Sequence, residues 1–168
     1  MIGVSSGALI ALKAALTLRS LRKLVIFEPP SALVTGMLAA QMGPAIFSHI
    51  PRWLLEPLTN AAMAGEDRRA IGNDVTMRML APTLHYDFQL IAEMEGSLES
   101  VKAITAEVLL LGGSKSPAYL KASVDGLARV LPNTTRFEFD GLAHGATGNR
   151  DRGGAPERVA EKVGEFLG

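Results

Sequence analysis

The sequence predicts an α/β domain in which helices cover a mainly parallel sheet. Two short apolar runs, residues 24–27 and 108–111, have the character of buried strands. Neither run alternates between apolar and polar residues, which is typical of a strand covered on both faces. Each run ends at a sharp stop, at Glu28-Pro29-Pro30 and Gly112-Gly113. Helical segments separate the strands, so the order of elements favours a layered α/β fold.

Helices are expected on either side of these runs. The segment from Ala8 to Leu18 is dense in alanine and leucine, which have high helix propensity. A second helix is expected to run from Pro117 to about Val130. Ser116 is the residue type that caps helices, and proline is favoured in the first turn.

The last strand and helix have different patterns. Residues 135–139 alternate, with Phe137 and Phe139 on one face and charged residues on the other. One wet face predicts a strand at or near the sheet edge. Pro156 opens the last helix, in which three apolar residues share a face: Val159, Val163 and Phe166.

The segment from about 31 to 84 interrupts this order. It holds Trp53, most of the methionines and several prolines, and it has no convincing strand. Short helices inserted between two strands could form a lid over a pocket, or could simply complete the core. Methionine suits either role. His49 and His85 are candidates for substrate contact in such a lid, although isolated histidines are more often surface or packing residues.

Composition excludes several classes of protein. The 168 residues suffice for one domain, 1–168, and 17 basic residues balance 17 acidic ones. No basic face is present to bind nucleic acid or a membrane surface. The absence of cysteine excludes disulfides and thiolate chemistry. No apolar run is long enough to span a membrane. The first residues lack a basic region and are interrupted by Lys13, so a cytoplasmic protein is expected.

No cofactor or metal is expected. The three histidines are too scattered to give a metal-ligand spacing. Gly112-Gly113 lacks the continuation that a phosphate loop or a dinucleotide-binding turn requires.

The residues from Gly3 to Gly7 fit the pattern G-x-S-x-G, between a short apolar start and a helix. A strand-to-helix turn of this kind exposes the hydroxyl of Ser5 in a strained conformation. The amino terminus of the helix adds positive potential, and the N–H of Ser6 lies where an oxyanion would form. The alternative is an ordinary helix N-cap by either serine.

His144 gives this pattern chemical meaning. It lies just past the last predicted strand and before the last helix. A loop after a parallel strand lies at the carboxyl edge of the sheet, the same edge as the turn that holds Ser5. A serine hydroxyl needs an imidazole to take its proton before it becomes a good nucleophile. The two residues together predict nucleophilic catalysis.

In this combination the sequence resembles the α/β-hydrolase superfamily, specifically its lidded esterase-like branch. The resemblance implies that Ser5 follows the fifth strand of that fold and that a lid follows the sixth. It covers the whole chain, which corresponds to the carboxy-terminal part of the family fold. It implies a serine hydrolase acting on a small, largely apolar ester or related acyl substrate. Epoxide and haloalkane hydrolysis are disfavoured, because those relatives need aspartate at position 5.

The acid of the implied triad is open between several residues. Ser116 occupies the position where many relatives have aspartate, but a serine cannot hold an imidazolium by charge. Other relatives place a carboxylate after the sixth strand, where Glu28 stands. A solvated charge at the strand end is the other interpretation of Glu28. Asp140 and Asp87 are further candidates.

The resemblance also implies missing parts. The first four strands and the second oxyanion donor of the family precede the serine turn, so we expect a truncated chain. Loss of one oxyanion donor typically lowers the rate by about 100- to 1,000-fold. The open strand edge at residues 1–4 favours pairing with another copy of the chain. The alternative to a hydrolase is therefore an inactive relative that binds a ligand or partner through this pocket and edge.

Overall fold

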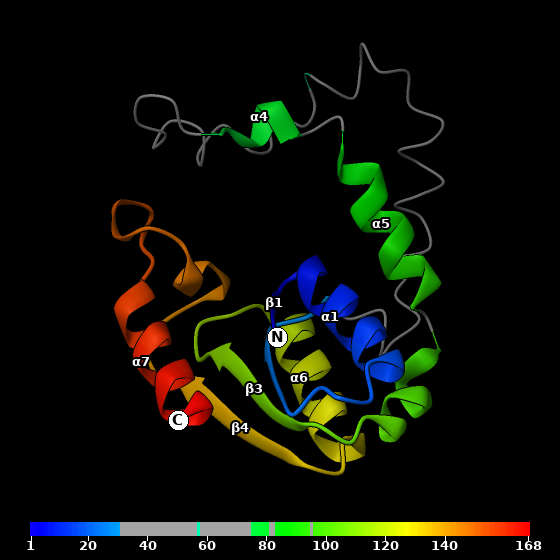
Figure 1. The fold of residues 1–168 in the computed structure, drawn as a ribbon. Coiled ribbons are helices and arrows are strands. Elements are labelled where there is room, and N and C mark those ends of the chain that lie inside the picture. Colours follow the sequence, from blue (N-terminus) through cyan, green and yellow to red (C-terminus); the bar gives the residue numbers. More distant parts are fainter. Residues whose placement is uncertain (31–56, 58–74, 81–82, 95) are drawn as a thin grey trace.

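The computed structural model describes residues 1–30, 57, 75–80, 83–94 and 96–168 (Figure 1). Most of the expected lid, about 31–84, lies outside these residues. The structure likewise does not describe His49 or the side chain of His85. The lid and the contacts expected of both histidines therefore stay predictions.

Four parallel strands form the sheet, in the order β1-β2-β3-β4. Their bounds are Ile2–Val4 for β1, Lys23–Phe27 for β2, Glu107–Gly113 for β3 and Thr134–Phe139 for β4. Val4 pairs with Phe27, and Phe27 pairs with Leu111. This register brings the carboxyl ends of neighbouring strands level. The residues that follow β1 and β2 therefore meet at one edge of the sheet, as the parallel arrangement predicts.

Helices cover both faces of the sheet (Figure 1). On one face lie α1 (Ser6–Thr17), α6 (Ala118–Val130) and the 3₁₀ helix η3 (Ser97–Ala103), and α5 (Leu84–Glu93) packs on α1. On the other face lies α7 (Pro156–Leu167). The short elements are α4 (Met77–Leu80) and the 3₁₀ helices η4 (His144–Thr147) and η5 (Arg150–Arg152).

The core explains why the central strands lack alternation. In β2, Leu24 and Ile26 pack with α1 and α6, whereas Val25 and Phe27 pack toward α7. The same division holds in β3. Because both faces are covered, residues 24–27 and 108–111 are apolar at every position, which confirms the prediction. The expected apolar face of the last helix is also confirmed, since Val159, Val163 and Phe166 pack on this second cluster.

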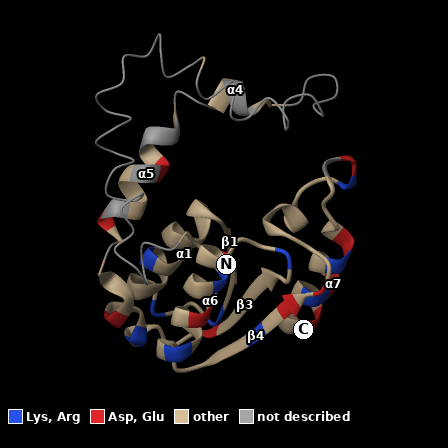
Figure 2. Cartoon of the chain, turned by 180° about the vertical axis from the view of Figure 1, so that it is seen from behind, with Lys and Arg blue, Asp and Glu red and all other residues tan. Residues whose placement is uncertain are grey.

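The last strand is an edge strand, as its alternation predicts. In the described sheet β4 has a neighbour only on the β3 side. Phe139 is buried in the core, whereas Arg136 is exposed and forms ion pairs with Asp125 and Glu138. Charged side chains of both signs also alternate along α7 (Figure 2). Such a mixed surface offers no single-sign patch to a polyanion on this helix.

One expected helix start is wrong. The N-cap of α6 is Pro117 rather than Ser116, and the helix begins at Ala118. Pro117 has an extended ψ of 145°, and its carbonyl accepts the N–H of Leu120. The Ser116 side chain is thereby left outside the helix and makes no capping hydrogen bond. None of the described helices combines the length and apolar character required to cross a bilayer.

Candidate active site

Ser5 occupies the turn between β1 and α1. Its backbone has φ 53° and ψ −127°, a strained conformation for a residue with a side chain. The turn is tied to the sheet, because the Ser5 N–H donates to the carbonyl of Phe27. The Ser5 side chain makes no capping hydrogen bond to α1. Ser5 is thus the N-cap residue of α1, as the alternative predicted, but its hydroxyl does not cap the helix and is available for another partner.

The two glycines of the pattern have different roles. A Cβ added at Gly3 would lie 2.6 Å from the carbonyl oxygen of Gly7 and 2.7 Å from Cα of Ala8. A Cβ at Gly7 would have no heavy atom within 4 Å among the described residues. Glycine at position 3 thus permits the close approach of β1 and α1, and this approach sets the direction of the turn at Ser5.

Glu28 directly follows β2 and is also strained. Its φ is 39°, and Ser5 and Glu28 are the two residues other than glycine with positive φ in the described part of the chain. The Glu28 side chain is fully buried. Its interpretation as a solvated charge at the strand end is therefore wrong. Strained residues tend to cluster at functional sites, where the surrounding structure supports them.

His144 lies between these two residues. Its Nδ1 is 2.8 Å from Glu28 Oε2, and its Nε2 is 3.2 Å from Ser5 Oγ. The residue begins η4, in the loop after β4, and its side chain is 37% exposed. The ring also lies near Phe27, with the ring centroids 6.4 Å apart. The three side chains thus form one hydrogen-bonded chain, which starts at a strained serine and ends at a buried carboxylate.

The chemistry of this arrangement follows from its hydrogen bonds. An ionised carboxylate accepts only, so the proton between Glu28 and His144 belongs to Nδ1 of the ring. The neutral imidazole then has a free electron pair at Nε2, which faces the Ser5 hydroxyl. This geometry allows the histidine to take the serine proton while the carboxylate balances the positive charge that develops on the ring.

The Glu28 carboxylate is held in its ionised form. Burial by itself would raise the pKa of Glu28. Interactions with His144 and Ser116, together with the N–H of Gly113 donating to Oε1 at 2.7 Å, outweigh burial and hold the pKa of Glu28 below its usual value. The Ser116 hydroxyl lies beside this carboxyl without the geometry of an ordinary hydrogen bond. Gly113 and His144 therefore make the close contacts.

Asp140 and Asp87, the other candidates for the acid that contacts His144, have different surroundings. Asp140 is exposed, and its Oδ1 accepts a hydrogen bond from the Ser114 hydroxyl. Asp87 lies in α5, the helix that packs on α1. Both ring nitrogens of His144 already have partners.

Ser6 is the first residue of α1, so its N–H lies in the first helical turn, where N–H groups have no acceptor within the helix. Its role as an oxyanion donor stays a prediction.

Gly113 was missed as a site residue. The sequence marks Gly112-Gly113 as the end of a strand, and nothing in it indicates a donor to a carboxylate 85 positions away. A Cβ at Gly113 would lie 2.3 Å from the carbonyl oxygen of Leu142, in the loop that carries His144. Glycine is therefore required for this loop to approach β3. The Gly112-Gly113 pair was the feature of the sequence that could have indicated this contact. Which loop packs against the pair is decided by the fold and cannot be derived from the two glycines.

Comparisons with known proteins agree with this architecture. No family model matches the sequence, and no curated protein matches it either. Among solved structures, a carboxyl esterase from Bacillus coagulans has a TM-score of 0.65 at 16% identity, over 99% of this chain and 63% of its own. A proline iminopeptidase from Mycobacterium smegmatis has a TM-score of 0.57 at 17% identity, over 99% and 63%.

A third structure is an α/β hydrolase from Sphaerobacter thermophilus, with a TM-score of 0.54 and 22% identity. The alignment covers 82% of this chain and 58% of that protein. The parallel sheet, its helical layers and these likenesses define the class as α/β, with the candidate site at the carboxyl edge of the strands. The chain has a partial α/β-hydrolase fold, and it spans less than two thirds of the length of these three structures.

Proposed function

We propose that this chain supplies the catalytic residues of a serine hydrolase that acts on a small, largely apolar ester or related acyl substrate. The observation that carries the proposal is the chain of contacts from Ser5 through His144 to Glu28. The fold of the Bacillus coagulans carboxyl esterase supports the reaction class. An ester substrate, as the name of that protein indicates, is part of the proposal for this chain.

The proposed reaction begins when Ser5 Oγ attacks the acyl carbon and His144 Nε2 takes the hydroxyl proton. The tetrahedral oxyanion accepts a hydrogen bond from the N–H of Ser6, at the positive end of α1. When the intermediate collapses, the bond to the alcohol breaks and His144 returns its proton to the leaving oxygen. Water then attacks the acyl-serine by the same route and regenerates the free hydroxyl.

A fluorophosphonate probe tests this proposal, because only an activated serine forms the covalent adduct. We expect the probe to label the purified chain at Ser5, with adduct mass and peptide mapping as the measurement. Ser5→Ala should abolish labelling. The matched control is Ser6→Ala, which keeps the backbone N–H and should label at a similar rate. A folded chain with no adduct at Ser5 would contradict the proposal.

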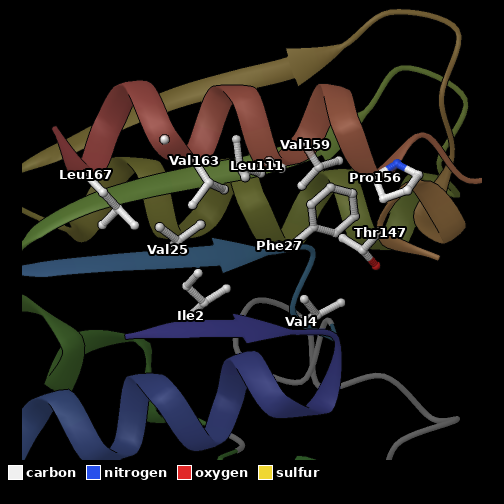
Figure 3. Close-up of a pocket in the computed structure, with 12 residues that line it drawn as sticks. Ile2, Val4, Val25, Phe27, Leu111, Thr147, Pro156, Val159, Val163 and Leu167 are labelled. Carbon is white, nitrogen blue, oxygen red and sulfur yellow. The ribbon is translucent and has the colours of Figure 1, made fainter. Parts of the chain in front are cut away.

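A second candidate function rests on the edge of β1 that faces away from β2, where the described residues provide no neighbouring strand. The carbonyl of Met1 and the N–H of Ser5 both bond to β2. Backbone alternation therefore turns the polar groups of Ile2 and Val4 to the opposite side. Beside them lies an apolar groove of about 450 Å³ between the sheet and α7 (Figure 3). None of the described residues that line this groove is charged.

We propose a second copy of the chain as the occupant of this edge. Two β1 edges related by a twofold axis can pair with each other and cover the same apolar side chains in both copies. Ile2 is 55% exposed, and the uncharged lining gives no preference for a charged partner. Sedimentation velocity over a concentration series should show a monomer–dimer equilibrium. A single monomeric species at all concentrations would contradict this candidate.

A further inference from the structure

Ser116 has a buried hydroxyl that the fold itself does not use. The residue is only 7% exposed, and its Oγ has no hydrogen-bond partner of ordinary geometry among the described residues. It does not cap α6, because Pro117 is the N-cap of that helix. A buried hydroxyl without a partner costs free energy, so its retention calls for an explanation.

The turn that carries Ser116 already holds the carboxylate of the site. The N–H of Ser116 donates to the carbonyl of Gly113 at 3.1 Å, which closes the turn after β3. The N–H of Gly113 in turn donates to Glu28 Oε1 at 2.7 Å. Ser116 thus belongs to the same turn as the backbone donor to Glu28, and its side chain is among the groups that lower the pKa of that carboxyl.

The Glu28 carboxylate depends on such neutral donors. Among the described residues, His144 is the ionisable group in contact with it, and no described lysine or arginine forms an ion pair with it. A fully buried carboxylate without a permanent cation needs hydrogen bonds to stay ionised. Oxygen Oε1 can accept a second hydrogen bond besides the one from the N–H of Gly113. Rotation of the Ser116 side chain about its Cα–Cβ bond is the movement by which its hydroxyl would become that donor.

We propose that Ser116 is a positioning residue whose hydroxyl donates to the Glu28 carboxylate and keeps Oε2 directed at Nδ1 of His144. Its effect on the reaction rests on the proposed hydrolase function. Its effect on the ionisation of Glu28 does not, since the same contacts exist in a chain that turns over no substrate. The turn after β3 would thus supply two donors to one carboxylate, one from its backbone and one from a side chain.

The decisive experiment is a titration of the His144 ring by ¹⁵N NMR from neutral to acidic pH, which reports the protonation of Glu28 through its Nδ1 contact. In Ser116→Ala we expect the midpoint assigned to Glu28 to rise by about one pH unit, because a donor to the charged form is lost. Ser116→Thr keeps a hydroxyl and should restore the original midpoint. Ser123→Ala removes another buried hydroxyl, which contacts the carbonyl of Pro30, and should leave the midpoint unchanged.

Ser116→Cys keeps a side chain of similar volume but has a thiol, which is a weaker hydrogen-bond donor than a hydroxyl. It replaces Ser116→Ala in the titration if the alanine variant does not fold. It should also raise the midpoint. A folded alanine or cysteine variant with the midpoint of the unsubstituted chain would overturn the proposal. The rate of fluorophosphonate labelling should fall about tenfold in Ser116→Ala and recover in Ser116→Thr. Absence of labelling in the unsubstituted chain would count against the hydrolase function, whereas an unshifted titration counts against Ser116.

Discussion

The backbone N–H of Gly113 donates a 2.7 Å hydrogen bond to Oε1 of Glu28, although 85 positions separate the two residues in sequence. The register of β2 and β3 makes this contact possible, because Phe27 pairs with Leu111 and both strands end at the same level. The bond leaves Oε2 of Glu28 facing His144. The orientation of the proposed acid is therefore set by the backbone of the neighbouring strand.

Removal of the carboxylate should test its assignment. Glu28→Gln keeps the size of the side chain and an acceptor for Gly113, but loses the charge that balances the protonated ring. We expect turnover, or the rate of probe labelling, to fall by about 10,000-fold, as loss of a triad acid does elsewhere. Asp140→Asn is the matched control and should keep its rate. Full activity in Glu28→Gln, with loss in Asp140→Asn or Asp87→Asn, would show that the assignment is wrong.

Stability should depend on pH through the same residue. The pKa of Glu28 is lowered in the folded chain from an ordinary value of 4.5. A depressed pKa contributes stability that is fully present above 4.5 and is lost as the pH falls through the folded value. Thermal unfolding should thus show a steeper loss of stability below this pH in the original chain than in Glu28→Gln. Equal slopes would mean that the ionised Glu28 does not stabilise the fold. Glu93→Gln, at an exposed ion pair with Lys13, is the control for surface carboxylates.

The two glycines around Ser5 should respond oppositely to alanine. Gly3→Ala places a Cβ against the backbone of Gly7 and Ala8, so we expect a loss of about 1–3 kcal/mol in the free energy of unfolding. Gly7 lies in the first turn of α1, and a Cβ at this position would contact none of the residues that the structure describes. Gly7→Ala should be neutral or stabilise the chain by up to about 1 kcal/mol. Denaturant titration measures both values, and a destabilised Gly7→Ala beside an unaffected Gly3→Ala would refute this account of the turn.

The proposed self-association should depend on Ile2. Ile2→Lys places a charge at the apolar groove and the open edge of β1, so the dimer should weaken by at least tenfold in dissociation constant. Ile10→Lys is the matched control, because Ile10 is as exposed as Ile2 but lies on α1, outside the groove. Sedimentation equilibrium measures both constants. Equal weakening by the two variants would indicate general loss of apolar surface instead of a specific edge.

Local chemistry was enough to predict the four strands, the helices α1, α6 and α7, and the placing of Ser5 and His144 at one edge of the sheet. The unbroken apolar runs at β2 and β3 show that both faces are covered, since each position must avoid water. The alternation in β4 predicts an edge strand for the opposite reason. Ser5, Glu28 and His144 each follow a predicted strand, which predicts a shared edge because the carboxyl ends of parallel strands meet there.

Only the tertiary structure decided the surroundings of Glu28 and Ser116. The residues next to Glu28 in the sequence, two prolines among them, are typical of an exposed charge at a strand end. Its actual partners, Gly113 and His144, are 85 and 116 positions away, so the local sequence does not indicate them. Ser116 before Pro117 has the local pattern of a helix cap, yet the chain extends through Pro117 and leaves the hydroxyl beside the carboxylate. Helix caps and strand ends depend on near neighbours. The ionisation of a buried group depends on whatever the fold places around it, and that is a property of packing.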